Sequence, residues 1–184
     1  MTPQLVRRFD RLEAARHRAL ATLEGFDATA LNRPPAAGKW SALQVLHHVV
    51  TAEALTLGYV RKKVQAGQAL PPAGPASRLR LLLVQATLAS PLRVRAPGPV
   101  ASVPPQIDPA ELCARWQELR LEWRGFIESF PGELLGRLVF RHPYAGRMTL
   151  DHALGTLQAH LDHHVPQVER ALSTGASLSA PASR

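Results

Sequence analysis

The chain has 184 residues, 46% of them hydrophobic and 20% charged, with one cysteine and a formal net charge of +8. These proportions are typical of a folded domain and exclude a disordered or fibrous chain, and a single cysteine excludes an internal disulfide. No stretch reaches the ~18 uninterrupted apolar residues of a membrane span, and the first residues lack the apolar segment of a secretory signal, so we expect a cytoplasmic protein with no membrane partner.

Two amphipathic helices are predicted in the first third of the chain. The first covers residues 3–23, with Thr2 as its N-cap and a proline at its first position, and its apolar residues recur at helical spacing. The second covers residues 42–65, because Ser41 and Gln44 form a capping-box pattern after a turn-rich segment. Each helix therefore has an apolar face to bury.

A long connection follows the second helix. Residues 68–107 hold eight of the sixteen prolines and cannot form one regular element, although residues 77–89 fit a short, mostly buried helix. A third long helix is predicted over residues 109–129, because Asp108 is followed by a proline and then by a glutamate three residues after the cap. A fourth is predicted over residues 149–174, before a glycine.

These elements place the chain in the all-α class. Four long amphipathic helices, the second and third joined by a crossover of about forty residues, most simply form a four-helix bundle. We expect one domain over residues 1–175 and a flexible C-terminal tail over residues 176–184. A domain of this length can bury a sizeable core without metal, so a bound metal would serve function.

Histidines give the strongest functional signal. Five of the eight fall into two clusters, His47–His48 in the second helix and His160, His163 and His164 in the fourth. Imidazole nitrogen binds Zn, Ni, Fe and Cu, and residues at i and i+4, such as His160 and His164, share a helix face. Around the fourth helix, His164 lies against the apolar stripe, His160 at its edge and His163 well away, where it would be solvated. The alternative pair, His160 with His163, would place a site outside the bundle.

The second cluster supplies a candidate third ligand. Apolar residues cover both sides of the second helix, so periodicity leaves His47 and His48 as alternatives. A closed structural zinc site needs four protein ligands, often cysteines that this chain lacks, whereas three histidines with an open fourth position are typical of a catalytic metal site. The pattern predicts a divalent-metal site, with polar boundary histidines that bind nothing as the alternative.

The positive charge and the cysteine are less informative. The arginines are scattered, without aromatic interleaving or a nucleic-acid-binding motif, so we expect a solvated surface and no nucleic-acid partner. Cys113 lies in the third helix with no histidine or cation as an evident helical neighbour, which predicts a buried apolar residue rather than a reactive thiol.

Three segments resemble the motifs of one family. Residues 38–53 (GKWSALQVLHHVVTAE) are similar to the W-S-x-x-x-V-L-x-H-h-x-x-x-E segment, h being apolar, of the DinB-like (YfiT-like) superfamily of proposed metal-dependent enzymes. Residues 142–150 (HPYAGRMTL) resemble its H-P-x-x-G-x-h-T-h turn, and residues 160–168 (HLDHHVPQV) resemble its H-x-x-x-H-x-x-Q-h motif. The helix order and the separations of the motifs agree over nearly the whole chain.

The resemblance implies an up-down-down-up four-helix bundle that binds a divalent ion, zinc or nickel. Carried over residue by residue, His48, His160 and His164 match the metal ligands, which favours His48 over its neighbour. Gln167 matches the motif glutamine and would orient a ligand imidazole from the second shell or act structurally. His142 matches the turn histidine, for which packing, turn capping and a role at the metal are alternatives.

One residue departs from the family pattern. Pro166 lies inside the fourth helix, two residues after His164, where it removes a backbone hydrogen bond. We expect it to kink or loosen the helix and so to shift His164 and weaken metal binding.

Some members of the family resemble thiol S-transferases. The resemblance therefore favours a metal-dependent transferase that activates a low-molecular-weight thiol, such as bacillithiol or mycothiol, and acts on a small-molecule substrate. A metal-dependent hydrolase is the alternative enzyme, and it needs a general base that the sequence does not identify. A non-catalytic bundle that binds a small ligand or a partner is the third interpretation, and a homodimer is plausible for so small a bundle.

Overall fold

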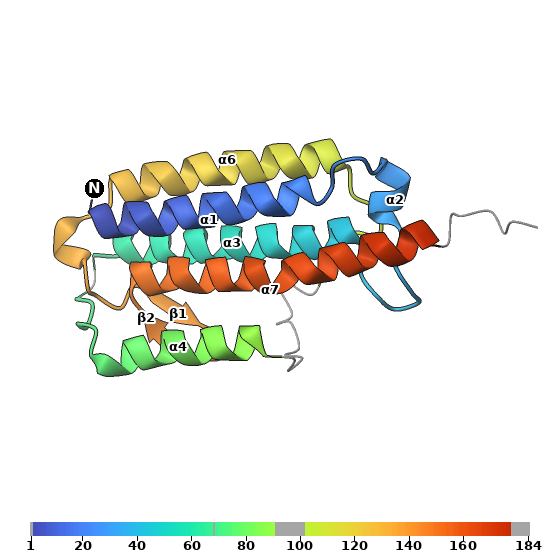
Figure 1. Cartoon of the computed structure of the whole chain (residues 1–184). Helices are drawn as coiled ribbons and strands as arrows, with labels where there is room; N and C mark the ends of the chain where they lie inside the picture. The colour runs from blue at the N-terminus through green and yellow to red at the C-terminus, as the bar shows by residue number, and fades with distance from the viewer. Residues whose placement is uncertain (1, 68, 91–101, 178–184) are drawn as a thin grey trace, which may run out of the picture.

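The computed structural model describes residues 2–67, 69–90 and 102–177. Its four long helices pack side by side into a bundle (Figure 1): α1 (Pro3–Ala21), α3 (Ala42–Gln65), α6 (Pro109–Glu128) and α7 (Leu150–Ser177). In Figure 1, α1 and α7 run in one direction and α3 and α6 in the other, which is the up-down-down-up order. The predicted four-helix bundle is confirmed. Residues 178–184, most of the predicted tail, lie outside the described residues.

Local sequence signals set the helix boundaries. The hydroxyl of Ser41 accepts the N–H of Gln44 at 3.2 Å, and the side chain of Gln44 accepts the N–H of Ser41 at 3.0 Å, which completes the capping box of α3. The carboxylate of Asp108 accepts two N–H groups in the first turn of α6. Thr2 occupies the cap position of α1 without a side-chain cap bond, so the proline that follows it is the stronger start signal.

A short helix that the sequence analysis did not predict follows α1. This helix, α2 (Ala28–Asn32), is capped by Asp27, whose carboxylate accepts the N–H of Ala30 at 2.7 Å. The side-chain amide of Asn32 both donates to and accepts from the backbone of Ile107, at 2.9 Å in each case. α2 is therefore tied to the segment that precedes α6, a contact 75 residues apart that no local pattern reveals.

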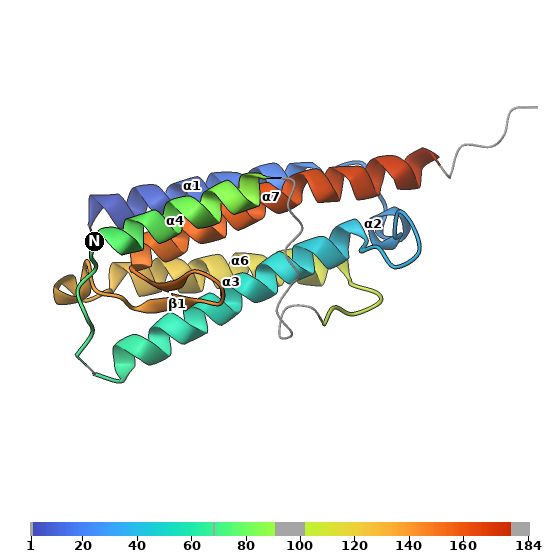
Figure 2. The same cartoon turned by 90° about the horizontal axis from the view of Figure 1, so that it is seen from below.

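A small antiparallel hairpin precedes α7. Its strands are β1 (Phe140–His142) and β2 (Gly146–Met148), and Gly146 has a φ of +80°, a left-handed conformation that the tight turn requires. Strands of three residues are too short to produce a period-two pattern, so the sequence predicts only a turn there. Figure 2 shows the hairpin between α3 and a further helix, α4 (Pro75–Ala89).

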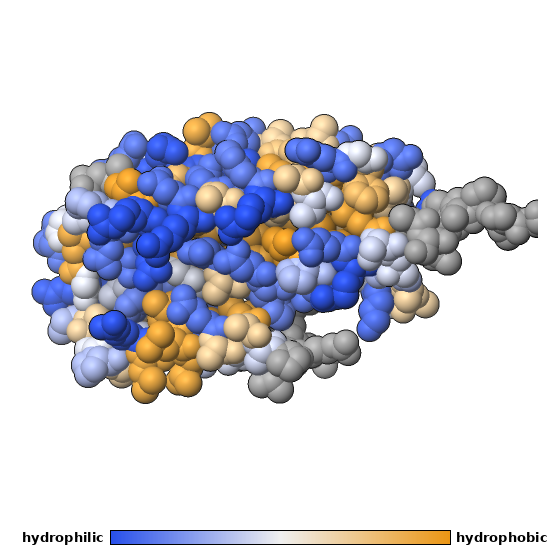
Figure 3. All heavy atoms as spheres, in the orientation of Figure 1, coloured by the Kyte–Doolittle hydropathy of each residue, from blue (hydrophilic) through white to orange (hydrophobic). Residues whose placement is uncertain are grey.

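α4 lies outside the four-helix bundle and covers α7 (Figure 1 and Figure 2). Because α3 and α6 run in the same direction, the chain must return along the bundle between them, and α4 makes part of this return. The prediction of a mostly buried helix is wrong, because α4 packs through one face only. Figure 3 shows hydrophobic side chains gathered over it. Its buried residues are Ser77, Leu81 and Val84, whereas its outer leucines, Leu79, Leu82 and Leu83, are more than half exposed.

A buried ion pair joins α3 to α6. The carboxylate of Glu53 accepts from Nη2 of Arg120 at 2.9 Å and from Nε1 of Trp116 at 3.1 Å, and all three side chains are fully buried. Glu13 of α1 approaches Nε of Arg120 at 3.3 Å. Burial raises the pKa of Glu53 and Arg120 opposes this rise. The glutamate that ends the 38–53 motif is therefore a structural residue of the core.

Among the described helices, none combines the length and the apolar composition that crossing a membrane would require.

Candidate metal centre

Three histidines meet between α3 and α7. His48 lies in the second turn of α3, and His160 and His164 lie one turn apart in the middle of α7. Nε2 of His160 is 3.2 Å from Nε2 of His48 and 3.1 Å from Nε2 of His164. One ring nitrogen from each residue lies within 4.8 Å of the other two. The structure thus brings together the three residues that the family resemblance singles out.

The arrangement of the three nitrogens fits a cation. A neutral imidazole has one N–H group and one lone pair, so a single hydrogen on Nε2 of His160 cannot satisfy contacts with two other Nε2 atoms. A cation satisfies all three nitrogens, because each can direct its lone pair at it. A tetrahedral zinc ion, 2.0–2.1 Å from each nitrogen, would hold them roughly 3.3–3.4 Å apart, close to the two separations that His160 makes with His48 and His164. The donor set therefore fits a divalent metal ion.

Core packing positions two of the rings and leaves the third partly open. The side chains of His48 and His164 are only 4% and 8% exposed, and His160 is half-buried. The ring of Trp40 packs on the ring of His48, with centroids 5.3 Å apart, and shields it from solvent. His164 on the core face and His160 at its edge agree with the helical periodicity.

Burial keeps His160 and His164 unprotonated at neutral pH. Burial, reinforced by the neighbouring His48, lowers the pKa of His164 to about 3, although its hydrogen bond to Gln167 acts in the opposite direction. Burial, reinforced by His164 and His48, holds the pKa of His160 well below its ordinary value of 6.5. Metal ligation requires neutral imidazoles, so these rings are ready to bind a metal ion at neutral pH.

The metal-free protein should lose stability as the pH falls below 6.5. An unfolded chain protonates His164 below that pH, whereas the folded chain does not until about pH 3, so acid favours the unfolded state. The contribution of His164 is fully present above pH 6.5, and about 2 kcal/mol of it should be lost by pH 5. Urea unfolding of the chelator-treated protein at several pH values measures this loss.

A His164→Gln variant is the matched control for this titration. It removes the titrating ring and leaves the other acidic and basic groups in place, so its unfolding free energy should fall less steeply between pH 6.5 and pH 5. If the unfolding free energies of the variant and the parent fell equally with pH, His164 would not be the source of the acid sensitivity.

Gln167 and His163 continue the site away from the bundle core. Nδ1 of His164 lies 3.1 Å from Oε1 of Gln167, and Nε2 of Gln167 lies 3.2 Å from Nε2 of His163. Nδ1 of His163 lies 2.6 Å from the carbonyl oxygen of Leu88 in α4. The prediction of a solvated His163 is wrong, because helical periodicity locates only the bundle core, and α4 covers this side of α7 as well. The alternative pairing of His160 with His163 does not occur.

His142 caps the hairpin turn. Its Nδ1 accepts the N–H groups of Tyr144 and Ala145 at 3.3 and 3.2 Å, so the ring proton lies on Nε2. Burial lowers the pKa of His142, and its ring is near enough to contribute to the lowered pKa of His160. Turn capping is thus its observed role, and Nε2 carries the hydrogen of the neutral ring.

Pro166 does not break α7. The helix is continuous from Leu150 to Ser177, with Pro166 exposed on its surface. Although the proline ring removes a backbone hydrogen bond in this turn, the His164 ring still meets His160. Packing of its face into the core keeps the His164 ring in the cluster, and the weaker metal binding expected from Pro166 stays a prediction.

Cys113 has no features of a reactive thiol. It is a free cysteine, half-buried in α6, and burial raises the pKa of its thiol, with Arg16 opposing the rise. A raised pKa lowers the thiolate fraction at neutral pH, which agrees with the predicted structural role.

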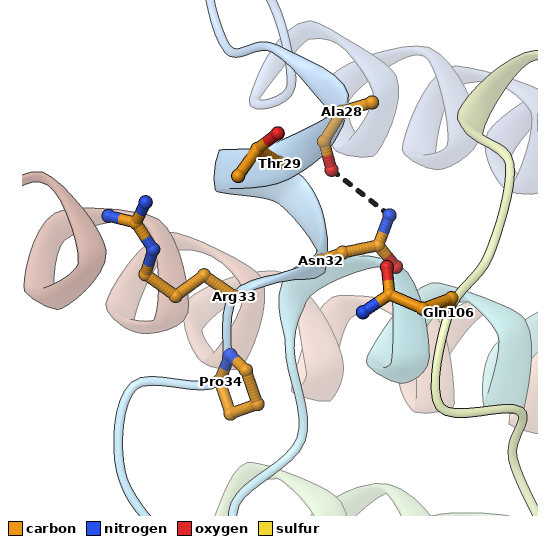
Figure 4. Close-up of a pocket in the computed structure, with 6 residues that line it drawn as sticks. All are labelled: Ala28, Thr29, Asn32, Arg33, Pro34 and Gln106. Carbon is orange, nitrogen blue, oxygen red and sulfur yellow. Dashed lines mark hydrogen bonds between the residues drawn. The ribbon is translucent and has the colours of Figure 1, made fainter.

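A hollow of about 370 Å³ lies beside α2, apart from the histidines. Figure 4 shows the Asn32 amide in its wall, turned back to donate to the carbonyl of Ala28 at 3.0 Å. Both polar atoms of that amide are already bonded to the backbone, so the Asn32 side chain is not available to a ligand in the hollow. Its lining residues are Ala28, Thr29, Asn32, Arg33, Pro34 and Gln106.

Comparisons with known proteins agree with the fold and the motifs. The sequence model of the DinB superfamily matches residues 11–168. A solved structure, YfiT from Bacillus subtilis, is similar at a TM-score of 0.57 and 20% identity, covering 93% of this chain and 87% of that one. YfiT is described as a probable metal-dependent hydrolase with an unusual four-helix bundle topology. No curated protein matches the chain.

Proposed function

We propose that this chain, which belongs to the DinB superfamily, is an enzyme that binds one divalent metal ion, zinc or nickel, through His48, His160 and His164. The convergence of the three rings carries this proposal, because Nε2 of His160 lies 3.2 Å from Nε2 of His48 and 3.1 Å from Nε2 of His164. Two of the rings are buried and the third is half-buried, so packing pre-positions the ligands, and three protein ligands leave a fourth coordination position for a substrate.

The charge of the donor set supports thiol activation as the reaction. Among the described residues, the cluster consists of three imidazoles and contains no carboxylate. Neutral ligands leave the full charge of a divalent ion uncompensated, which favours an anionic fourth ligand, either a hydroxide or the thiolate that the family resemblance favours. When bound, such an ion lowers the pKa of a coordinated thiol or water. We therefore propose transfer of a low-molecular-weight thiol, such as bacillithiol or mycothiol, to an electrophilic small molecule.

The residues of this chain have separate tasks in that reaction. His48, His160 and His164 hold the ion, and Gln167 accepts the Nδ1–H of His164 and so keeps the Nε2 lone pair of that ring directed at it. The ring of Trp40 excludes water from the side of His48. His142 carries its hydrogen on Nε2, and we assign that N–H a hydrogen bond to the incoming substrate.

A metal-dependent hydrolase is the second candidate, because YfiT is described as one. Hydrolysis benefits from a general base that takes a proton from water. The two N–H groups that donate to Nδ1 of His142 require the ring hydrogen on Nε2, so this ring is a donor and not that base. The site therefore favours a reaction whose nucleophile is activated by the ion alone.

Partners other than a small molecule receive less support. Several arginines already pair with carboxylates of the same chain: Arg8 with Asp151, Arg18 with Asp162, and Arg61 with Glu122. These pairs reduce the positive charge available to a phosphate backbone, so we propose no nucleic-acid partner. A cytoplasmic location and a homodimer stay predictions.

Metal analysis tests the proposal first. Protein purified without an affinity tag should contain about one zinc or nickel ion per chain. The loaded protein should consume an electrophile such as monochlorobimane with bacillithiol or mycothiol, and chelation should abolish this activity. A wild-type protein that takes up neither zinc nor nickel would refute both enzyme proposals.

The assay also separates the alternatives. Turnover of an ester or amide without added thiol would favour the hydrolase. A metal-loaded protein inactive in both assays would indicate a non-catalytic binding bundle.

A further inference from the structure

A chain of hydrogen bonds links the end of α4 to the histidine cluster. It runs from the carbonyl oxygen of Leu88 to Nδ1 of His163 at 2.6 Å, and from Nε2 of His163 to the amide nitrogen of Gln167 at 3.2 Å. It ends with Oε1 of Gln167 and Nδ1 of His164 at 3.1 Å. Nε2 of His164 is the atom that faces His160, so the chain leads into the proposed metal site.

The carbonyl of Leu88 gives this chain its direction. A carbonyl can only accept, so Nδ1 of His163 must donate to it, and the Nε2 of a neutral ring must then accept. Only the NH₂ group of the Gln167 amide can donate to that nitrogen, which leaves its oxygen facing His164. Nδ1 of His164 must therefore carry the hydrogen, and Nε2 keeps its lone pair.

The reverse orientation of the amide would disable the ligand. With the NH₂ group of Gln167 facing His164, Nδ1 of that ring would accept and Nε2 would carry the hydrogen, so it could not bind a metal ion. Sequence spacing alone places Gln167 beside His164 but does not set the orientation of its amide. His163 is the residue that sets it.

We propose that His163 is a positioning residue for the metal ligand His164, acting through Gln167 and anchored to α4 by the Leu88 carbonyl. The proposal rests on the proposed metal site and adds to it a residue outside the ligand set. It also couples the crossover helix to the centre, because displacement of the last turn of α4 would remove the acceptor that orients His163.

Metal affinity in single and double variants tests this relay. His163→Phe and Gln167→Leu should each weaken binding of Zn²⁺ or the spectroscopic probe Co²⁺ by roughly 10-fold to 100-fold, measured by competition with a chelator. The double variant should bind the metal as tightly as the single variant with the lower affinity, because His163 acts through Gln167. Effects that multiply would overturn the proposal.

The Gln167→Glu variant tests whether His163 acts by orienting the side chain at position 167. In Gln167→Glu both side-chain oxygens can accept from His164, so no neighbour is needed to orient the group. Adding His163→Phe to Gln167→Glu should therefore change metal affinity less than about 2-fold, against the larger loss expected in the wild-type background. A purely structural role for His163 would weaken binding equally in both backgrounds and would overturn the proposal.

His152→Phe is the matched control. Nδ1 of His152 lies 2.8 Å from Oγ of Ser77, so this ring also joins α7 to α4 but contacts neither Gln167 nor the cluster. Its loss should leave metal affinity unchanged even if the melting temperature falls as in His163→Phe. Equal losses of metal affinity in both variants would show that weakened α4 packing, and not the relay, is responsible.

The tautomer of His164 can be measured without metal. Imidazole ¹⁵N chemical shifts of the wild-type apoprotein should show His164 protonated at Nδ1, and Gln167→Leu should abolish this preference. Protonation at Nε2 in the wild type would overturn the relay. A wild type with the expected tautomer that binds no metal would refute the proposed function alone, so the two failures are distinguishable.

Discussion

Replacement of His160 by alanine should empty the metal site. Nε2 of His160 is the atom that both His48 and His164 approach, at 3.2 and 3.1 Å, so its loss removes the central ligand of the cluster. We expect the metal content to fall from about one ion per chain to less than about 0.1, and affinity to fall by more than the roughly 10–100-fold that follows loss of an outer hydrogen-bond partner. Elemental analysis and Co²⁺ titration measure the two quantities.

His47→Ala is the matched control for this substitution. His47 is the sequence neighbour of His48 and is half-buried in α3, but it is not part of the cluster. This variant should keep its metal ion and thiol-dependent activity. Retention of a full complement of metal by His160→Ala, or its loss in His47→Ala, would contradict the assignment of the ligands.

Replacement of Glu53 by alanine should cause the largest loss of stability. It would leave the guanidinium of Arg120 and the indole N–H of Trp116 in the core without the carboxylate that they share. Breaking a buried ion pair from one side costs about 3–5 kcal/mol. For a chain of this length, that loss lowers Tm by roughly 10 °C. Urea unfolding and calorimetry of the metal-free protein give both numbers.

Replacing both Glu53 and Arg120 should reduce stability less than replacing Glu53 alone. In Glu53→Leu combined with Arg120→Met, no unpaired charge of the pair remains in the core, so the double variant should be more stable than Glu53→Ala. Arg18→Ala is the surface control, because Arg18 and its partner Asp162 are 61% and 44% exposed. Its effect should be roughly 0–1 kcal/mol. A Glu53→Ala variant as stable as Arg18→Ala would contradict the structural role of the buried pair.

The helices could be predicted because their signals are local. The Ser41 capping box and the Asp108 cap act within one turn, and both occur where the sequence predicts them. The short elements could not be predicted in the same way. The single turn of α2 is held by a partner distant in the sequence, as the bond of Asn32 to Ile107 illustrates. The strands of the hairpin pair with each other, but at three residues each they are too short to produce a period-two pattern.

Local sequence signals likewise predict part of the candidate site and leave the rest undecided. The i, i+4 spacing of His160 and His164 and the apolar stripe place both rings on one face of α7, because a helix has a fixed period. That period gives no choice between His47 and His48, since α3 is buried on more than one side. The family resemblance favours His48, and the structure places its ring beside the other two.

By itself, the sequence determined the helix order, the helix starts and the face of α7 on which two candidate ligands lie, because capping and periodicity depend on residues within a turn or two. Only the tertiary structure decided what surrounds α7 on its other sides. α4 packs there, so His163 meets the carbonyl of Leu88 instead of solvent. The partner of Glu53 is likewise set by the packing of α3 against α6. These contacts join residues far apart in the chain, and side-chain packing, not local periodicity, selects them.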